Sequence, residues 1–188
     1  VSHTRLHSDG RTRCSWVTDD EIYVRYHDLE WGSEGRGQRE LFEAICLEGF
    51  QAGLSWITIL KRREGFRQAF ENFDIEKVAR FDANKIEELM LNPGIIRNRA
   101  KIISAINNAN VVLDRKLDLT ELIWSHAPKV RQTPAEGFTW QATSSESVAL
   151  SKTLRKLGFS FVGPTTMYAL MQSSGLVQDH APGCFRRV

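Results

Sequence analysis

Residues 143–166 have the sequence TSSESVALSKTLRKLGFSFVGPTT, which predicts two helices joined by a tight turn. Thr143 and Glu146 are spaced as in a capping box, so a helix is expected to begin at this point. The link at 158–163 has a glycine at each end, and Pro164 suits the first position of the next helix, where a backbone N–H would have no partner. A hairpin beside a helix N-terminus presents backbone N–H groups that can hold a phosphate, although an ordinary connection between two helices gives the same pattern.

The rest of the chain also shows the periodicity of helices. Apolar side chains in the segment 39–52 fall on one arc at a spacing of about 3.6 residues, and the segments 54–70 and 95–113 predict two further helices. Asp74 and Asp82 are expected to cap two short helices. We find no alternating pattern typical of strands and no internal repeat, so the expected fold class is all-α.

Length and composition exclude several classes of protein. The chain has 188 residues, of which 41% are apolar and 26% charged, so its composition is that of a globular domain rather than a disordered chain. No apolar run approaches the roughly 20 residues of a membrane helix, and the N-terminus lacks the apolar segment of a secretory signal. The 3 cysteines are widely spaced, which argues against a disulfide framework. A cytoplasmic protein with no membrane partner is therefore expected.

Pattern and charge predict one domain with a tail. Residues 1–12 are polar and unpatterned and are expected to form a flexible tail, whereas residues 13–188 are expected to form a single helical domain and, with nothing to suggest assembly, a monomer. The net charge of +2 is small, so a nucleic-acid partner would need clustered cations. Lys152, Arg155 and Lys156 form such a cluster before the hairpin, although a solvated basic surface gives the same pattern.

Four side chains from opposite ends of the chain form a candidate metal site. They are Cys14 and His27 near the N-terminus and His180 and Cys184 near the C-terminus. Zinc favours four such ligands in a tetrahedron, and two ligands from each end would fix termini that otherwise fray. With four protein ligands no coordination position is open, so one zinc ion would be structural rather than catalytic. Two free thiols and two surface histidines are the alternative.

A second group combines one carboxylate with several aromatic rings. Glu48 lies at the edge of the apolar arc of its helix, where a carboxylate needs a partner or a cleft. Aromatic residues occupy the flanking segments: Trp16, Tyr26, Trp31 and Trp56. Such a set suits a flat cationic base, because ring faces attract positive charge and the carboxylate accepts from N–H groups. The alternative is that the rings belong to the core and that Glu48 reaches solvent.

These segments together resemble the DNA-3-methyladenine glycosylase I family of the helix-hairpin-helix superfamily. The longest matching stretch, ICLEGFQAGLSWI at 45–57, is unusual enough to make the match specific. Residues 1–12 lie outside the resemblance. The matching stretches cover nearly all the rest of the chain, and they are Arg13–Trp16, Tyr26–Gly32, Ile45–Ile57, Gly94–Arg97, Gly158–Gly163 and Asp179–His180.

The resemblance implies base-excision repair of alkylated double-stranded DNA. The reaction would be hydrolysis of the N-glycosidic bond of 3-methyladenine, which leaves an abasic site, and one structural zinc ion would be held by the four cysteine and histidine residues named above. Glu48 would contact a flipped base stacked between Tyr26 and Trp56. Trp16 and Trp31 would lie nearby in the same pocket. The hairpin would grip the DNA backbone through Gly158, Phe159, Ser160, Val162, Gly163 and Thr165.

Two positions distinguish this chain from other branches of the superfamily. Bifunctional relatives carry a lysine nucleophile early in the second hairpin helix, whereas Thr165 stands there, so no lyase step is expected. Asp179 lies near an aspartate that many relatives use toward water or the oxocarbenium ion. Its neighbour His180 is a proposed ligand, so a role in orienting that ligand or in capping a helix is equally open.

Leu54 is the expected wedge that fills the gap left by the flipped base.

Two other functions remain open on the sequence. The chain could be a zinc-stabilised module that binds DNA without catalysis, in which the aromatic residues are core. It could instead be a zinc hydrolase with an open metal position. Release of a base from methylated DNA separates the first of these from a glycosylase, and immediate loss of activity on chelation identifies the second.

Overall fold

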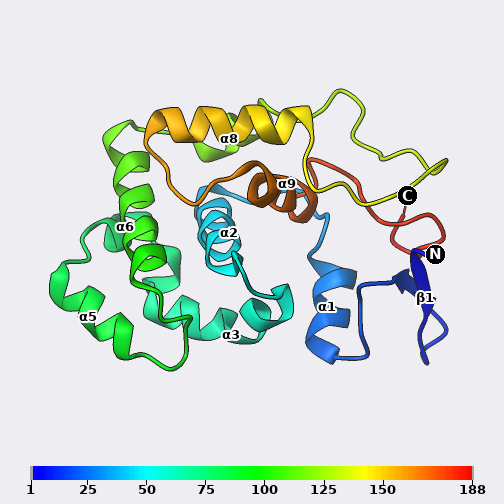
Figure 1. The fold of residues 1–188 in the computed structure, drawn as a ribbon, viewed down its shortest axis with the longest axis horizontal. Helices are drawn as coiled ribbons and strands as arrows, with labels where there is room; N and C mark the ends of the chain where they lie inside the picture. Colours follow the sequence, from blue (N-terminus) through cyan, green and yellow to red (C-terminus); the bar gives the residue numbers. More distant parts are fainter. Residues whose placement is uncertain (1, 188) are drawn as a thin grey trace.

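The computed structural model describes residues 2–187 and confirms a mainly helical fold (Figure 1). Val1 and Val188, which end the two predicted regions, lie outside the described residues. The helices are α1 Glu21–Leu29, α2 Gln38–Gln51, α3 Trp56–Ala69, α4 Ile75–Ala79, α5 Ala83–Leu91, α6 Arg99–Asp114, α7 Leu119–Trp124, α8 Ser145–Leu157 and α9 Pro164–Ser173, with a 3-10 turn at Glu71–Phe73.

Side-chain caps explain where several helices begin. The carboxylates of Asp74 and Asp82 accept from backbone N–H groups at the starts of α4 and α5, as predicted. The capping box of α8 is one residue later than predicted. Ser144, not Thr143, is the N-cap, because its hydroxyl accepts from the N–H of Ser147 while the Ser147 hydroxyl accepts from the N–H of Ser144.

Two other helices begin later than the sequence pattern suggests. The spacing of Thr18 and Glu21 predicts a capping box at Thr18, but Asp20 is the N-cap of α1 and accepts from the N–H of Ile22, so the helix begins at Glu21. The helix predicted at 95–113 begins only at Arg99, because the Asn98 side chain caps it and accepts from the N–H of Lys101. In both cases a local polar cap outweighs the apolar periodicity that precedes it.

Helix α2 lies at the centre of the molecule, and α3, α6, α7 and α9 pack against it (Figure 1). Every residue from Leu41 to Phe50 is buried, including Cys46. A helix buried on all sides is normally apolar, yet α2 also buries Glu43 and Glu48. Since burying an unpaired carboxylate is costly, these two positions mark where polar contacts or a site must lie.

The N-terminal residues differ from the prediction. Thr4–Leu6 (β1) pairs antiparallel with Thr12–Cys14 (β2), so the expected tail without strands is wrong for this segment. The turn between the strands places Gly10 at φ +79, a conformation that glycine adopts without strain. The hairpin is held by Arg13, which is fully buried and ion-paired with Asp9, a contact that local periodicity does not reveal.

The two ends of the chain meet on one side of the molecule (Figure 1). There they form a second apolar core, separate from the large one around α2, in which Cys14 and Val17 pack with Ala181 and Cys184. Tyr26 and Trp31 belong to this second core as well. None of the helices in residues 2–187 is both long enough and apolar enough to cross a membrane.

Candidate active site and metal centre

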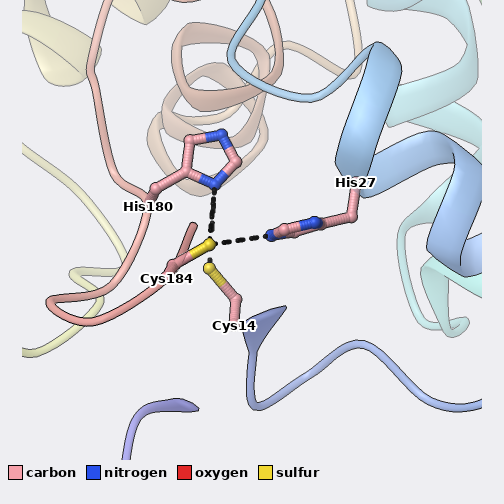
Figure 2. Close-up of side chains that lie close together, drawn as sticks. All are labelled: Cys14, His27, His180 and Cys184. Carbon is pink, nitrogen blue, oxygen red and sulfur yellow. Dashed lines mark hydrogen bonds between the residues drawn. The ribbon is translucent and has the colours of Figure 1, made fainter. Parts of the chain in front are cut away.

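The four candidate metal ligands come together inside the second core, although Cys14 and His180 are 166 positions apart. The Cys184 sulfur lies 3.4 Å from Nε2 of His27 and 3.7 Å from Nδ1 of His180. The Cys14 sulfur lies 3.8 Å from the same His180 nitrogen. Zinc, with bonds of about 2.1 Å to nitrogen and about 2.3 Å to sulfur, would hold tetrahedral ligands about 3.6 Å apart. Figure 2 shows the four side chains turned toward one centre, so the geometry fits this metal.

The ring nitrogens that face away from the centre are also bonded. Nδ1 of His27 lies 2.8 Å from the Asp28 carboxylate, and that carboxylate accepts two hydrogen bonds from Arg13. Nε2 of His180 lies 3.2 Å from the backbone carbonyl oxygen of Trp31. Such outer contacts fix the orientation of metal-binding histidines. Arg13 and Asp28 adjoin candidate ligands in the sequence, but no sequence pattern predicted this role for them.

The environment of the two thiols favours a bound cation. The hydrogen bond from Cys14 and the two imidazoles lower the pKa of Cys184, and the neighbouring sulfur raises the pKa of Cys14. The N–H groups of Ala181 and Arg186 each donate to one of the sulfurs. A divalent ion at the centre would stabilise both thiolates together. All four donors belong to the protein, so an ion held by all of them would have no open coordination position.

An aromatic cavity of about 340 Å³ lies where the two apolar cores meet. All five residues predicted for base binding and catalysis line it: Trp16, Tyr26, Trp31, Glu48 and Trp56. The volume is in the range of small-molecule sites. Six further residues, which no sequence pattern predicted, complete the lining: Tyr23, Gln51, Trp140, Gln141, Ala169 and Gln172.

Glu48 is the acidic residue of this cavity. Its side chain is buried, and among residues 2–187 its Oε2 atom has no hydrogen-bond partner. Burial raises the pKa of Glu48 to about 8, and the positive charge of Arg36 opposes this shift. The indole Nε1 of Trp56 is likewise buried without a partner in the described chain. A buried acceptor and a buried donor left free in one cavity point to a polar ligand that would satisfy them.

The rings of the cavity are in contact with one another. The centroids of Tyr26 and Trp56 are 5.6 Å apart with the planes tilted by 49°. A base stacked between them needs about 7 Å, twice the contact distance of carbon atoms, so it can enter there only if the rings separate. Trp16 and Trp31 meet edge to face at 5.1 Å and form another wall.

A larger cavity of about 750 Å³ lies on the other side of Glu48. It shares Tyr26, Glu48 and Trp56 with the aromatic cavity, but ion pairs such as Arg63–Glu30 and Arg67–Glu43 line most of it. Carboxylates that are already paired with arginines attract a flat cationic ring only weakly. The aromatic cavity is therefore the better candidate for a base.

The hairpin predicted to contact DNA separates into buried and exposed parts. Phe159 and Val162 have 4% and 1% of their surface exposed and belong to the main core, so only their backbone can reach a ligand. Gly163 precedes α9, whose N-terminus has no side-chain cap. Thr165 is exposed in the first turn of that helix. The Arg155 guanidinium lies beside Gly163, and free N–H groups next to a cation suit a phosphate.

Asp179 lies outside the lining of both cavities. Its buried carboxylate accepts hydrogen bonds from the hydroxyls of Thr133 and Tyr168 and from the Gln172 amide. These contacts tie the 129–142 loop to α9 beside the ligand His180. The geometry therefore favours the role of orienting its neighbours over a direct role in chemistry.

Comparisons with known proteins agree with this geometry. The family model described as methyladenine glycosylase matches residues 16–187. The chain is 48% identical to the DNA-3-methyladenine glycosylase of Haemophilus influenzae, over 92% of this chain and 96% of that protein. It is 47% identical to DNA-3-methyladenine glycosylase 1 of Escherichia coli, over 92% and 95%. A crystal structure of a 3-methyladenine DNA glycosylase I superposes with a TM-score of 0.88 at 43% identity, covering 94% of this chain and 100% of that one. The chain therefore belongs to the methyladenine glycosylase family.

Proposed function

We propose that this protein removes 3-methyladenine from alkylated DNA by hydrolysing the N-glycosidic bond, which releases the free base and leaves an abasic site. The observation that carries the proposal is a buried carboxylate, Glu48, with a free oxygen in an aromatic cavity. The names of the close relatives support the same reaction.

Charge explains the choice of the methylated base. Methylation at N3 makes the adenine ring cationic, so each face of Tyr26 or Trp56 that it meets contributes about 0.5–2 kcal/mol. The positive charge of the bound base favours the ionised form of Glu48, which then accepts from the exocyclic amine and stabilises the cation. Neutral adenine gains neither electrostatic term. Selection therefore occurs when the base is turned out of the duplex and tested in the cavity.

The chemical step needs little acid assistance because the cationic base is a good leaving group. Ground-state binding of the cation alone would slow its departure, since the base becomes neutral as it leaves. Acceleration must come from contacts that strengthen as the sugar becomes positive. No lysine lines either cavity in residues 2–187, and Thr165 occupies the place of the lysine nucleophile, which supports a hydrolase without a lyase step.

The DNA partner is proposed to be double-stranded. The hairpin would hold one phosphate through backbone N–H groups near Gly163 and Thr165, because the N–H of Ser160 already donates to Asn108, and Gly158 allows the turn at φ +110. Leu54, which is 41% exposed beyond the end of α2, is the proposed wedge. An apolar side chain in solvent at this place suits insertion into a base stack.

The metal is proposed to be one zinc ion per chain, held by Cys14, His27, His180 and Cys184. When bound, it would supply structural cross-linking of the two chain ends, because all four positions are protein ligands. We further propose that residues 13–188 act as one glycosylase domain in a cytoplasmic monomer.

A base-release assay on methylated duplex DNA tests the proposal. The wild-type protein should release 3-methyladenine in a single turnover, and Glu48→Gln should release it on the order of 10- to 100-fold more slowly. Glu64→Gln, on the exposed surface of α3, is the matched control and should keep the wild-type rate. A wild-type protein that binds DNA but releases no base would instead be a non-catalytic binding module.

A further inference from the structure

One face of α6 carries buried polar side chains. Lys101, Ser104 and Asn108 are spaced three and four residues apart, so they lie in one row along the helix. Each is less than 10% exposed, at 8%, 6% and 2%. Buried polar groups on a helix need partners, and in this row the partners are backbone atoms of two separate loops.

Lys101 holds the first loop, at the end of α2. Its ammonium donates to the carbonyl oxygens of Phe50 at 2.9 Å and Ala52 at 2.6 Å. No carboxylate in residues 2–187 lies within ion-pair distance of the Lys101 ammonium. The partial negative charge at the C-terminus of α2 faces the ammonium instead. Gly53 follows at φ +82, and the exposed side chain of Leu54 comes directly after it. Lys101 thus fixes the base of the segment that carries the proposed wedge.

Ser104 and Asn108 hold the second loop, the DNA hairpin. The Asn108 amide donates to the carbonyl of Ser160 at 3.1 Å and accepts from its N–H at 3.0 Å. The Ser104 and Ser160 hydroxyls lie 2.6 Å apart. Phe161, the next residue, is 41% exposed at φ +55, an unfavourable conformation for an aromatic residue that this bonding maintains.

We infer that α6 is a rigid spacer between the hairpin that grips the DNA backbone and the loop that carries Leu54, and that Lys101 is a positioning residue for base extrusion. The inference rests on the proposed function. The row from residue 101 to 108 spans about 10 Å of helix, or about three base-pair steps of DNA. A fixed spacing lets the phosphate grip and the wedge act together on one short stretch of duplex, so the wedge fills the stack as the base leaves it.

Substituting Lys101 by methionine removes both hydrogen bonds and keeps the length of the side chain. The loop at 52–55 then loses its anchor, while Glu48 and the rings of the cavity keep their contacts. Extrusion from a duplex should suffer, and binding of a base that is already free should not. If Lys101 has only a structural role, base release from the duplex and binding of the free base should be weakened equally.

The experiment measures two quantities for wild type, Lys101→Met, Lys101→Arg and the exposed control Lys77→Met on α4. The first is single-turnover release of 3-methyladenine from a methylated duplex and from the same strand unpaired. The second is the affinity for free 3-methyladenine, followed by tryptophan fluorescence. Lys101→Met should slow base release from the duplex on the order of 10- to 100-fold. The rate of release from the single strand and the affinity for free 3-methyladenine should each change less than about twofold. Lys101→Arg should restore most of the duplex rate, and Lys77→Met should match wild type.

Equal slowing on duplex and single strand, or a loss of free-base affinity as large as the loss of rate, would overturn the inference, and so would an unchanged duplex rate. If Lys101→Met does not fold, Ser104→Ala on the hairpin side of the row should give the same split, and its absence would overturn the inference. A wild-type protein that releases no base from either substrate would refute the proposed function itself, which this design detects separately.

Discussion

The Nε2 atom of His180 lies 3.2 Å from the backbone carbonyl oxygen of Trp31, and the two rings meet edge to face at 4.7 Å. One residue is a candidate metal ligand and the other lines the aromatic cavity. The metal centre and the cavity are therefore joined by direct contact. Anything that loosens the ligands should also loosen this wall of the cavity.

Removal of the proposed metal should lower stability first and activity as a result. Elemental analysis of the purified protein should find one zinc ion per chain, and a chelator should lower the Tm, because the ion would cross-link the two chain ends. Base affinity should fall in step with the loss of structure around Trp31. Protein without zinc and with reduced Cys14 and Cys184 would contradict the assignment. An immediate loss of activity at unchanged Tm would indicate a catalytic metal instead.

The buried carboxyl of Glu48 should make stability depend on pH. Burial raises its pKa from 4.5 to about 8, so between these values the folded protein retains a proton that the unfolded chain has lost. Titration of Glu48 therefore lowers the free energy of unfolding as the pH rises from about 4.5 to about 8. Above that range this contribution stays constant. Glu48→Gln cannot titrate, so its stability relative to wild type should increase over this window, by up to about 5 kcal/mol in total.

Urea unfolding of both proteins at several pH values between 5 and 9 measures this difference. Glu64→Gln, on an exposed position of α3, should differ from wild type by a small and constant amount. A difference between Glu48→Gln and wild type that is equally constant would mean that the Glu48 carboxylate is ionised throughout and has a partner in solution.

The two rings beside Glu48 should contribute unequally to selection of the methylated base. Trp56→Ala removes a whole aromatic face and should weaken binding of the cationic base by about tenfold, a loss of 1–2 kcal/mol. Tyr26→Phe keeps the ring and should change the affinity by less than about threefold. Calorimetry with 3,9-dimethyladenine, which keeps the positive charge that the methylated base has in DNA, and with neutral 9-methyladenine measures the ratio of affinities, which should fall only for Trp56→Ala. Equal losses for both bases would show that Trp56 acts through shape alone.

Local chemistry made much of the fold predictable. The carboxylates of Asp74 and Asp82 cap helices where the sequence places them, because a cap depends on atoms within three residues. The predictions failed where two local signals compete. Thr143 and Ser144 both suit a cap, and only the packed structure selects the second. The pairing of residues 4–6 with 12–14 was missed because strands of 3 residues are too short to show an alternating pattern.

The sequence by itself determined which chemical groups the protein has: a long apolar helix interrupted by Glu48, aromatic residues on either side of it, and two cysteine–histidine pairs at opposite ends. Only the tertiary structure decided that these pairs share one centre and that the carboxylate lies between an aromatic and a charged cavity. It also revealed the row on α6 that joins two loops. The physical reason is that helix periodicity and capping act within a few residues, whereas these arrangements join segments from 50 to more than 160 positions apart.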